Sequence, residues 1–338
     1  MVKTSPWLNN STHPPIEMSS RIRLARNVEG LNYPHLIKDD KEYAPIIETI
    51  TTDYPEFNVI HMNELTDIEK ELMNEKFLIS KLFKNRGVTL IVSEDETTSI
   101  MIGEEDHIRI QVVNVGRSLE ELYEVASDID DALEKDLTYQ FDRQYGYKTA
   151  CPTNVGTGLR ASVMLHLPAL TRNKRIKRLR DVLTRMGYTL RGIYGEGTHP
   201  VGDVYQLSNQ VTLGLIELEI IHHLEEIKEQ IIFEETRMRD WFYQNRALTV
   251  RDTVFRSYGL LKYAEQMSLE EAAMHLSHLK YGVDMGILEI ENFEFQTILN
   301  QIQRAFVRQS IESVEPAYID AAENKARATI LKRRLGGI

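Results

Sequence analysis

Residues 151–160 read Cys151-Pro152-Thr153-Asn154-Val155-Gly156-Thr157-Gly158-Leu159-Arg160. Gly156 and Gly158 permit positive φ and let the backbone approach a ligand closely. Thr153, Asn154 and Arg160 add hydroxyl, amide and guanidinium donors, which are groups that bind anions in such loops. The stretch therefore favours an anion-binding loop that leads into a buried strand, with a plain polar turn as the alternative.

The order of residues excludes two other phosphate-handling loops. Eight residues separate Cys151 from Arg160, which is more than the loop of a cysteine-dependent phosphatase has. Leu159 and Arg160 follow the second glycine, where a nucleotide P-loop requires Lys and then Ser or Thr. The nature of the anion therefore has to be inferred from other segments of the chain.

The composition is that of an ordinary globular protein. With 338 residues, of which 42% are hydrophobic and 27% charged, the chain is long enough for about two domains. Its net charge of -11 argues against nucleic acid as a partner, because the phosphate backbone would be repelled.

The sequence also indicates a compartment. The single cysteine cannot form an internal disulfide, as is usual for a protein of a reducing environment. Residues 1–18 lack the apolar core of a signal peptide, and no apolar run approaches the ~18 residues that a membrane span needs. We therefore expect a cytoplasmic protein with neither a membrane nor a nucleic-acid partner.

Three regions follow from the pattern along the chain. Residues 1–18 are rich in Asn, Ser, Pro and Thr and are expected to form a loose arm. Residues 19–246 mix short apolar runs with amphipathic helices, whereas residues 247–338 carry mainly helical signals. We place a domain boundary near residue 246, where the composition changes.

Several elements can be predicted within these regions. The sequence predicts a hairpin of strands 87–92 and 98–102, a helix capped by Ser118, a buried strand at 162–167, a solvated basic helix at 172–185 and a long amphipathic helix at 216–231. Farther along, a helix is expected to begin after Ser268 and to stop at Gly282.

Three further segments carry charges in patterns that a fold alone does not require. Residues 19–26 read Ser-Ser-Arg-Ile-Arg-Leu-Ala-Arg, and in an extended strand Arg21 and Arg23 share one face while the aliphatic residues pack inward. Residues 104–109 read Glu-Glu-Asp-His-Ile-Arg and place three carboxylates beside a cation. Residues 191–197 read Arg-Gly-Ile-Tyr-Gly-Glu-Gly, a glycine-rich loop with one Glu.

Taken in the order in which they occur along the chain, these three segments and residues 151–160 resemble the phosphagen kinase family. Members of that family transfer the γ-phosphoryl group of ATP to a guanidinium nitrogen. The resemblance spans roughly residues 18–240, and the run from Cys151 to Val163 is highly specific to it. Within the family, the chain is most similar to the bacterial protein arginine kinases. The resemblance implies an α+β fold, in which an antiparallel sheet flanked by helices is followed by a helical C-terminal domain at 247–338.

The resemblance also implies roles for individual residues. A guanidinium has a pKa above about 12, so a proton must leave as the N–P bond forms. Glu105 is the implied base, Glu196 the second carboxylate that holds the guanidinium, and Cys151 a thiol beside it. The implied nucleotide contacts are Ser19, Ser20, Arg21, Ile22, Arg23, Arg109, Arg160, Ala161, Ser162, Val163, Met164, Arg191, Gly192, Ile193, Tyr194, Gly195 and Glu196. ATP is the implied co-substrate, with Mg²⁺ on its phosphates and no metal site in the protein.

The chain ahead of the first arginine motif bears on the substrate. Small-substrate phosphagen kinases carry a helical domain there, and a loop of that domain closes over the substrate. Only eighteen residues precede Ser19 in this sequence. We therefore expect an open site that accepts arginine within a protein. Phosphorylation of free arginine is the alternative, and a catalytically silent nucleotide-binding adaptor is a third reading.

Partners are implied by the resemblance alone. Residues 247–338 resemble a region that dimerises and senses phosphoarginine. Its Arg-Asp-x-x-Arg-Ala motif is altered here to Glu323-Asn324-Lys325-Ala326-Arg327-Ala328. The implied partners are proteins with exposed arginines, an activating adaptor, a heat-shock repressor and a Clp ATPase, with phosphoarginine marking proteins for degradation. A homodimer is expected.

Overall fold

A computed structural model describes residues 3–9, 14–193, 200–311 and 315–337. Within these residues, eight strands form one sheet in which each neighbouring pair is antiparallel. In spatial order the strands are β2 (Asn58–His61), β3 (Thr89–Val92), β4 (Thr98–Ile102), β5 (Ile108–Asn114), β1 (Glu17–Arg26), β8 (Leu159–His166), β10 (Val204–Asn209) and β9 (Tyr188–Gly192). A separate hairpin consists of β6 (Phe141–Asp142) and β7 (Gly146–Tyr147).

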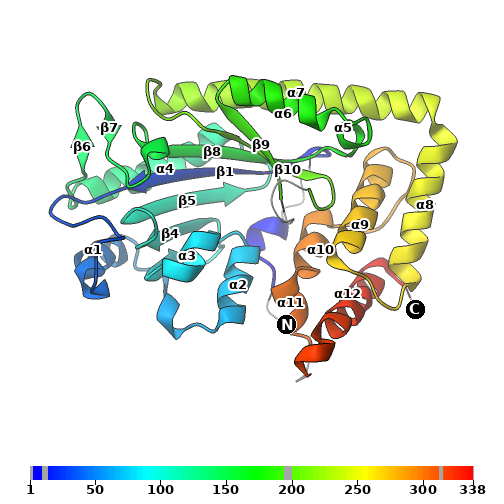
Figure 1. The fold of residues 1–338 in the computed structure, drawn as a ribbon, viewed down its shortest axis with the longest axis horizontal. Coiled ribbons are helices and arrows are strands. Elements are labelled where there is room, and N and C mark those ends of the chain that lie inside the picture. The colour runs from blue at the N-terminus through cyan, green and yellow to red at the C-terminus, as the bar shows by residue number, and fades with distance from the viewer. Residues whose placement is uncertain (1–2, 10–13, 194–199, 312–314, 338) are drawn as a thin grey trace.

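Helices flank the sheet and make up the C-terminal part (Figure 1). The first group is α1 (Ala44–Asp53), α2 (Asp67–Glu75), α3 (Lys81–Arg86), α4 (Leu119–Glu134), α5 (Pro168–Arg172), α6 (Ile176–Arg185) and α7 (Glu217–Asn245). The second group is α8 (Ala247–Tyr263), α9 (Leu269–Asp284), α10 (Phe295–Gln301), α11 (Arg304–Arg308) and α12 (Ile319–Leu335). Short 3₁₀ turns are η1 (Pro6–Asn9), η2 (Asp40–Tyr43), η3 (Met62–Glu64), η4 (Pro152–Asn154) and η5 (Pro316–Tyr318). The predicted fold class is confirmed.

The two faces of the sheet differ because successive side chains on a strand alternate in direction. Ile22 and Leu24 of β1 are buried in the main apolar core. Helices α4 and α7 supply the other side of that core through residues such as Leu122 and Leu224. The opposite face of the same strands is polar, and it is there that the arginines project.

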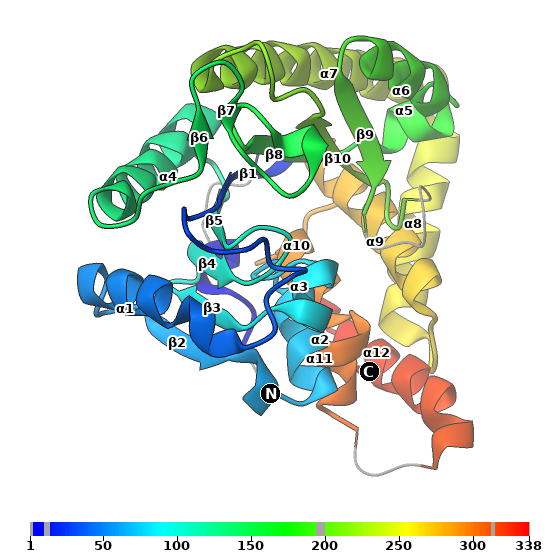
Figure 2. The same cartoon turned by 60° about the vertical axis from the view of Figure 1, so that its left-hand side comes forward.

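Three groups of residues border the polar face. Phe83 of α3 packs against Leu90 and Met101 at one end of the sheet. Residues of η1 pack against Val113 of β5. At the other end, Val204 of β10 joins the apolar core of the C-terminal helices. Helix α2 also lies against α11, so the first third of the chain contacts the C-terminal helices (Figure 2).

Several predicted elements are confirmed. The strands at 87–92 and 98–102 pair as the antiparallel hairpin of β3 and β4. Ser118 caps α4 through reciprocal hydrogen bonds with Glu121. The predicted strand at 162–167 is part of β8. Residue 246, near which a domain boundary is predicted, lies between α7 and α8, and the boundary itself stays a prediction.

The structure differs from the prediction of a loose N-terminal arm. Trp7 and Leu8 are buried against Val113 of β5, because two large apolar side chains gain free energy by covering part of the sheet's face. Strand β1 then begins at Glu17. The arm is therefore a packed segment over residues 3–9.

Two helix boundaries also differ from the prediction. The basic helix expected at 172–185 is divided into α5 and α6, because Lys174 between them has φ of 57°. Helix α9 does not stop at Gly282. This glycine lies where α9 crosses α8, and a Cβ there would lie 2.4 Å from Val254. The helix continues to Asp284, and Gly286 follows its end with φ of 66°.

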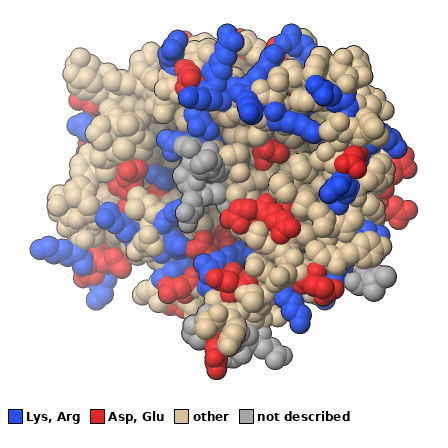
Figure 3. Space-filling model, turned by 45° about the vertical axis from the view of Figure 1, so that its right-hand side comes forward, with Lys and Arg blue, Asp and Glu red and all other residues tan. Residues whose placement is uncertain are grey.

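Lys and Arg side chains gather along the edge of the molecule where α6 and α7 lie, at the top of Figure 3. Arg175 and Arg237 of this surface pair with Glu234. In the described part of the chain, no helix is both long enough and apolar enough to span a bilayer.

Candidate active site

The polar face of the sheet presents arginines from three neighbouring strands. Arg21 and Arg23 come from β1, Arg160 from β8 and Arg109 from β5. The register places Arg23 opposite Arg160, and Ala25, the next residue on that face, opposite Arg109. Neighbouring strands lie about 4.8 Å apart, so these guanidinium groups start from closely spaced backbone positions.

Burial and neighbouring cations lower the pKa of three of these arginines. Burial, and then Arg160 and Arg109, lower the pKa of Arg21 to about 10. Burial and the surrounding arginines hold the pKa of Arg23 well below its usual value. Burial, and then Arg191 and Arg109, lower the pKa of Arg160. Positive charges in such an arrangement repel one another unless an anion lies among them.

Unused hydrogen-bond donors also indicate that an anion binds among these arginines. Among the described residues, the Nε atoms of Arg23 and Arg160 are buried and have no hydrogen-bond partner. Arg21 donates to Ser162 Oγ at 3.4 Å, and Arg160 donates to Ser208 Oγ at 3.2 Å. Phosphate oxygens accept strong charge-assisted hydrogen bonds from guanidinium groups. The arginines therefore offer unused donors to phosphate groups.

The described residues offer Mg²⁺ no ligand cluster of their own. Nowhere in residues 3–9, 14–193, 200–311 and 315–337 do three His, Cys, Asp or Glu side chains come close enough to hold a metal ion. The arginines, by contrast, would hold a nucleotide whose phosphates can carry the ion.

A cavity of about 260 Å³ lies beside the arginines. It is lined by Arg23, Ala25, Glu105, Arg109, Cys151, Thr153, Asn154, Gly158 and Arg160. The fold thus brings the expected base and the expected cysteine to one place with three of the expected nucleotide arginines, although these residues come from distant parts of the sequence.

Glu105 is the carboxylate that faces this cavity. Its side chain is 34% exposed, and one of its oxygens lies 3.3 Å from Arg109 Nη2. The same oxygen accepts a hydrogen bond from Asn154 Nδ2 at 3.4 Å. Glu104, the preceding residue, is fully buried, pairs with Arg109 and accepts a hydrogen bond from Ser80. Only Glu105 of this pair is therefore placed to receive a proton from a substrate.

Asp106 has a supporting position behind the cavity. It is buried, and its Oδ1 accepts hydrogen bonds from Asn27 Nδ2 and from the Ala150 backbone N–H, each at 2.7 Å. Asn27 Oδ1 in turn accepts from the His107 backbone N–H at 2.9 Å. These bonds fix the loop of Glu105 to the segment that leads into Cys151.

The loop of Cys151 is held by close backbone contacts. Gly156 has φ of 114°, and a Cβ there would lie 2.1 Å from the carbonyl oxygen of Thr212. The Thr212 hydroxyl lies within hydrogen-bond distance of the carbonyl oxygens of Thr153 and Val155. The Cys151 thiol lies 3.0 Å from Thr153 Oγ1. The predicted need for glycine in this loop is thus explained by the approach of a second backbone segment.

Other expected nucleotide contacts lie away from the cavity. The side chains of Ile22, Ala161 and Val163 are buried in the core on the opposite face of the sheet, away from the arginine side chains. Met164 and Ile193 pack against the core of the C-terminal helices.

The remaining expected contacts are placed as follows. Ser19 and Ser20 are buried on β1, and Ser20 donates to Glu17 at 2.9 Å. Arg191 is exposed on β9 beside Gly192. Tyr194, Gly195 and Glu196 lie outside the described residues.

Comparison with protein families covers nearly the whole chain. The profile described as "ATP:guanido phosphotransferase, C-terminal catalytic domain" matches residues 40–238. The profile described as "Protein-arginine kinase McsB C-terminal domain" matches residues 247–338. Both parts of the chain therefore correspond to known families.

Individual relatives agree with these matches. A protein of Staphylococcus saprophyticus named "Protein-arginine kinase" is 42% identical over 332 residues, which cover 98% of this chain and 97% of that protein. A protein of the same name from Staphylococcus aureus strain USA300 is 41% identical with the same coverage.

Solved structures show the same fold. Lombricine kinase is 27% identical with a TM-score of 0.56, and the match covers 69% of this chain and 72% of that one. A duplicated taurocyamine kinase from Schistosoma mansoni, with bound components of a transition-state analogue, is 24% identical with a TM-score of 0.58; the match covers 70% of this chain and 36% of that one. This chain belongs to the ATP:guanido phosphotransferase family and, over almost its full length, to the protein-arginine kinases within it.

Proposed function

We propose that this protein uses ATP to phosphorylate guanidinium groups of arginine residues in other proteins. The observation that carries the proposal is the placement of Glu105 in one cavity with Arg23, Arg109 and Arg160. Relatives named "Protein-arginine kinase" that match 98% of the chain support it further. A carboxylate beside a group of phosphate-binding cations is the arrangement that transfer to a guanidinium requires.

The reaction follows from the chemistry of the two groups. A guanidinium nitrogen of the substrate attacks the γ-phosphorus of ATP, the bond from that phosphorus to the bridging oxygen breaks, and ADP leaves. Glu105 accepts the proton that the nitrogen loses. Arg23, Arg109 and Arg160 offset the negative charge that spreads over the transferring phosphoryl group. Glu196 is proposed as the second carboxylate on the substrate.

Labelling distinguishes this function from phosphorylation of free arginine. The protein is incubated with ATP, Mg²⁺ and either an arginine-rich protein or free arginine, and acid-labile phosphate on arginine is measured by mass spectrometry. We expect labelling of the protein substrate. Labelling of free arginine alone would show that the substrate class is wrong, and labelling of neither would refute the kinase.

A matched pair of variants tests the assigned base. Glu105→Gln removes the proton acceptor and is expected to reduce the rate of labelling by about 10²-fold or more. Glu48→Gln changes an exposed carboxylate on α1 and is expected to leave the rate unchanged. Labelling by Glu105→Gln at the rate of the unmodified protein would refute the role of Glu105.

A cellular role is proposed on the family relationship. In the cytoplasm, phosphoarginine would mark proteins for a Clp-type protease and inactivate a heat-shock repressor, with an activating adaptor and a homodimer as the working assembly. Pull-down of a Clp ATPase by an arginine-phosphorylated protein, and failure of the unphosphorylated protein to do so, is the expected result.

The altered motif of the C-terminal region is proposed to have a structural role. Glu323 accepts hydrogen bonds from Arg304 Nε at 3.0 Å and from Arg308 Nε at 2.5 Å. Arg327 is buried and donates to Asn324 Oδ1 and to backbone carbonyl oxygens, and Ala328 is buried. Arg304 and Arg308 therefore hold α11 against α12 through Glu323. Calorimetric titration with phosphoarginine is expected to show no binding at this motif.

A further inference from the structure

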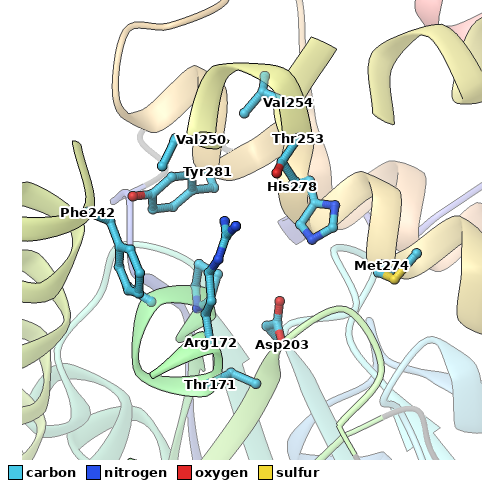
Figure 4. Close-up of a pocket in the computed structure, with 12 residues that line it drawn as sticks. Thr171, Arg172, Asp203, Phe242, Val250, Thr253, Val254, Met274, His278 and Tyr281 are labelled. Carbon is cyan, nitrogen blue, oxygen red and sulfur yellow. The ribbon is translucent and has the colours of Figure 1, made fainter. Parts of the chain in front are cut away.

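A second cavity, of about 420 Å³, lies where the sheet region meets the C-terminal helices (Figure 4). Residues of α5 and α7, the residue that precedes β10, and residues of α8 and α9 line it. It shares no lining residue with the cavity that contains Glu105. Its size is within the range of cavities that hold small molecules.

Two opposite charges project into this cavity. The guanidinium of Arg172 extends into its middle, with its central carbon 5.6 Å from the centre of the Phe242 ring (Figure 4). The carboxylate of Asp203 lies at its floor and accepts a hydrogen bond from Ser277 Oγ at 2.7 Å. Within the described residues, Arg172 forms no ion pair, with Asp203 or with any other carboxylate.

The rest of the lining is mainly apolar. Phe242, Tyr281, Val254 and Met274 surround the space beside Arg172 (Figure 4). His278 also lines the cavity, and burial lowers the pKa of its ring to about 4. His278 is therefore uncharged at neutral pH, and the cavity has one positive and one negative group between apolar walls.

We propose that this cavity binds a free α-amino acid with an apolar side chain. The carboxylate of the ligand would meet Arg172, its ammonium group would meet Asp203, and its side chain would lie against Phe242 and Val254. A simple anion would also face the charge of Asp203, and a simple cation would face that of Arg172. Only a ligand with both charges gains charge-assisted hydrogen bonds at each end.

Asp203, which lines this cavity, is close in sequence to Glu196, the proposed second carboxylate on the kinase substrate. Asp203 comes seven residues after Glu196 in the sequence. Residues 201–203 are held in place, because the Val201 backbone N–H donates to the Ile193 carbonyl oxygen at 3.1 Å and Asp203 accepts a hydrogen bond from Ser277 of α9. We expect occupation of the cavity to change the rate of turnover. The binding itself does not depend on the proposed kinase activity.

Calorimetric titration of the full-length protein tests the proposal. The probes are L-phenylalanine and L-leucine, together with phenethylamine, which lacks the carboxylate, and 3-phenylpropanoate, which lacks the ammonium group. We expect at least one amino acid to bind, and each single-charge analogue to bind at least about tenfold more weakly than L-phenylalanine.

Variants assign the binding to this cavity. Arg172→Gln removes the cation, and Met274→Trp fills the space from a position that is 44% exposed; both are expected to weaken binding at least about tenfold. Arg185→Gln, an exposed arginine on α6 outside the cavity, is the matched control. Thermal melting shows that each variant is folded.

Three results would overturn the proposal. The first is the absence of binding by both amino acids. The second is 3-phenylpropanoate or phenethylamine binding as tightly as L-phenylalanine, which would indicate a site for a single charge. The third is binding that Arg172→Gln and Met274→Trp leave unchanged, which would place the ligand elsewhere.

Discussion

Arg23 on β1 lies directly opposite Arg160 on β8 in the antiparallel register of the sheet. Like charges opposite each other on neighbouring strands destabilise a sheet, and each of these residues keeps a buried Nε without a partner among the described residues. The sheet therefore holds a repulsive pair in its polar face. We infer that the free energy lost there is recovered when phosphate binds.

Arg23→Gln separates the functional contribution of this residue from its structural one. We expect kcat/KM for ATP to fall by about 10²- to 10³-fold, because one preorganised donor to the phosphoryl group is lost. The melting temperature is expected to stay the same or to rise, because repulsion is relieved. Steady-state phosphorylation and thermal unfolding measure the two effects, with Arg185→Gln on α6 as the control. A large loss of stability with activity retained would show that Arg23 is structural.

Anions are expected to stabilise the fold through the same residues. A ligand at a hundred times its dissociation constant adds about 2.7 kcal/mol to the free energy of unfolding. ATP with Mg²⁺, and more weakly inorganic phosphate, should therefore raise the melting temperature, whereas sodium chloride at equal ionic strength should not. The increase should shrink in Arg23→Gln. An equal increase in that variant would place the bound anion somewhere else.

Asp106→Ala tests the support behind Glu105. Two hydrogen-bonded donors, on Asn27 and Ala150, would lose their acceptor, at a cost of about 1–3 kcal/mol each. Turnover by the folded protein should also fall, because the Glu105 loop is no longer fixed to Cys151. Asp142→Ala is the control, since Asp142 accepts two backbone hydrogen bonds in the β6–β7 hairpin and lies outside the cavity. This control should lose stability without losing turnover.

Glu75 gives the contact between α2 and α11 a dependence on pH. Its carboxylate accepts hydrogen bonds from the backbone N–H groups of Ala305 and Phe306 at 2.9 and 3.2 Å. Burial nevertheless raises the pKa of Glu75 to about 7, above the value of about 4.3 in an unfolded chain. The contribution of this group to stability is therefore fully present below about pH 4 and is lost as the pH rises through 7.

This pH dependence is measured as the urea concentration at the midpoint of unfolding, from about pH 5 to about pH 8. Between these values the stability of Glu75→Gln should fall less steeply than that of the unmodified protein, because glutamine keeps an acceptor but does not ionise. Comparison of the two proteins cancels the other titrating groups. Parallel curves would show that Glu75 titrates with an ordinary pKa.

The regular parts of the fold could be predicted from the sequence, because they depend on local patterns. Alternation placed Arg21 and Arg23 on one face, and turn residues marked the hairpin of β3 and β4. The separate roles of the three adjacent carboxylates could not be predicted from the local pattern, and only the family resemblance distinguished Glu105. Asp106 is distinguished by Asn27, which lies 79 residues away in the sequence, and no local pattern reports such a contact.

Gly156 in the Cys151 loop and Gly30, which lies outside that loop, form a matched pair that tests why the loop requires glycine. Gly156 has φ of 114° and Gly30 has φ of 82°, so alanine at either position is strained by about 1–3 kcal/mol. At Gly30 a Cβ would meet nothing within 4 Å, whereas at Gly156 it would lie 2.1 Å from the Thr212 carbonyl oxygen. Gly30→Ala should therefore lose only that stability and keep its turnover. Gly156→Ala must displace the loop of Cys151 from the backbone of Thr212, so it should lose more stability and most of its turnover as well. Equal losses in the two variants, measured by urea unfolding and phosphorylation rate, would mean that positive φ alone requires glycine in this loop.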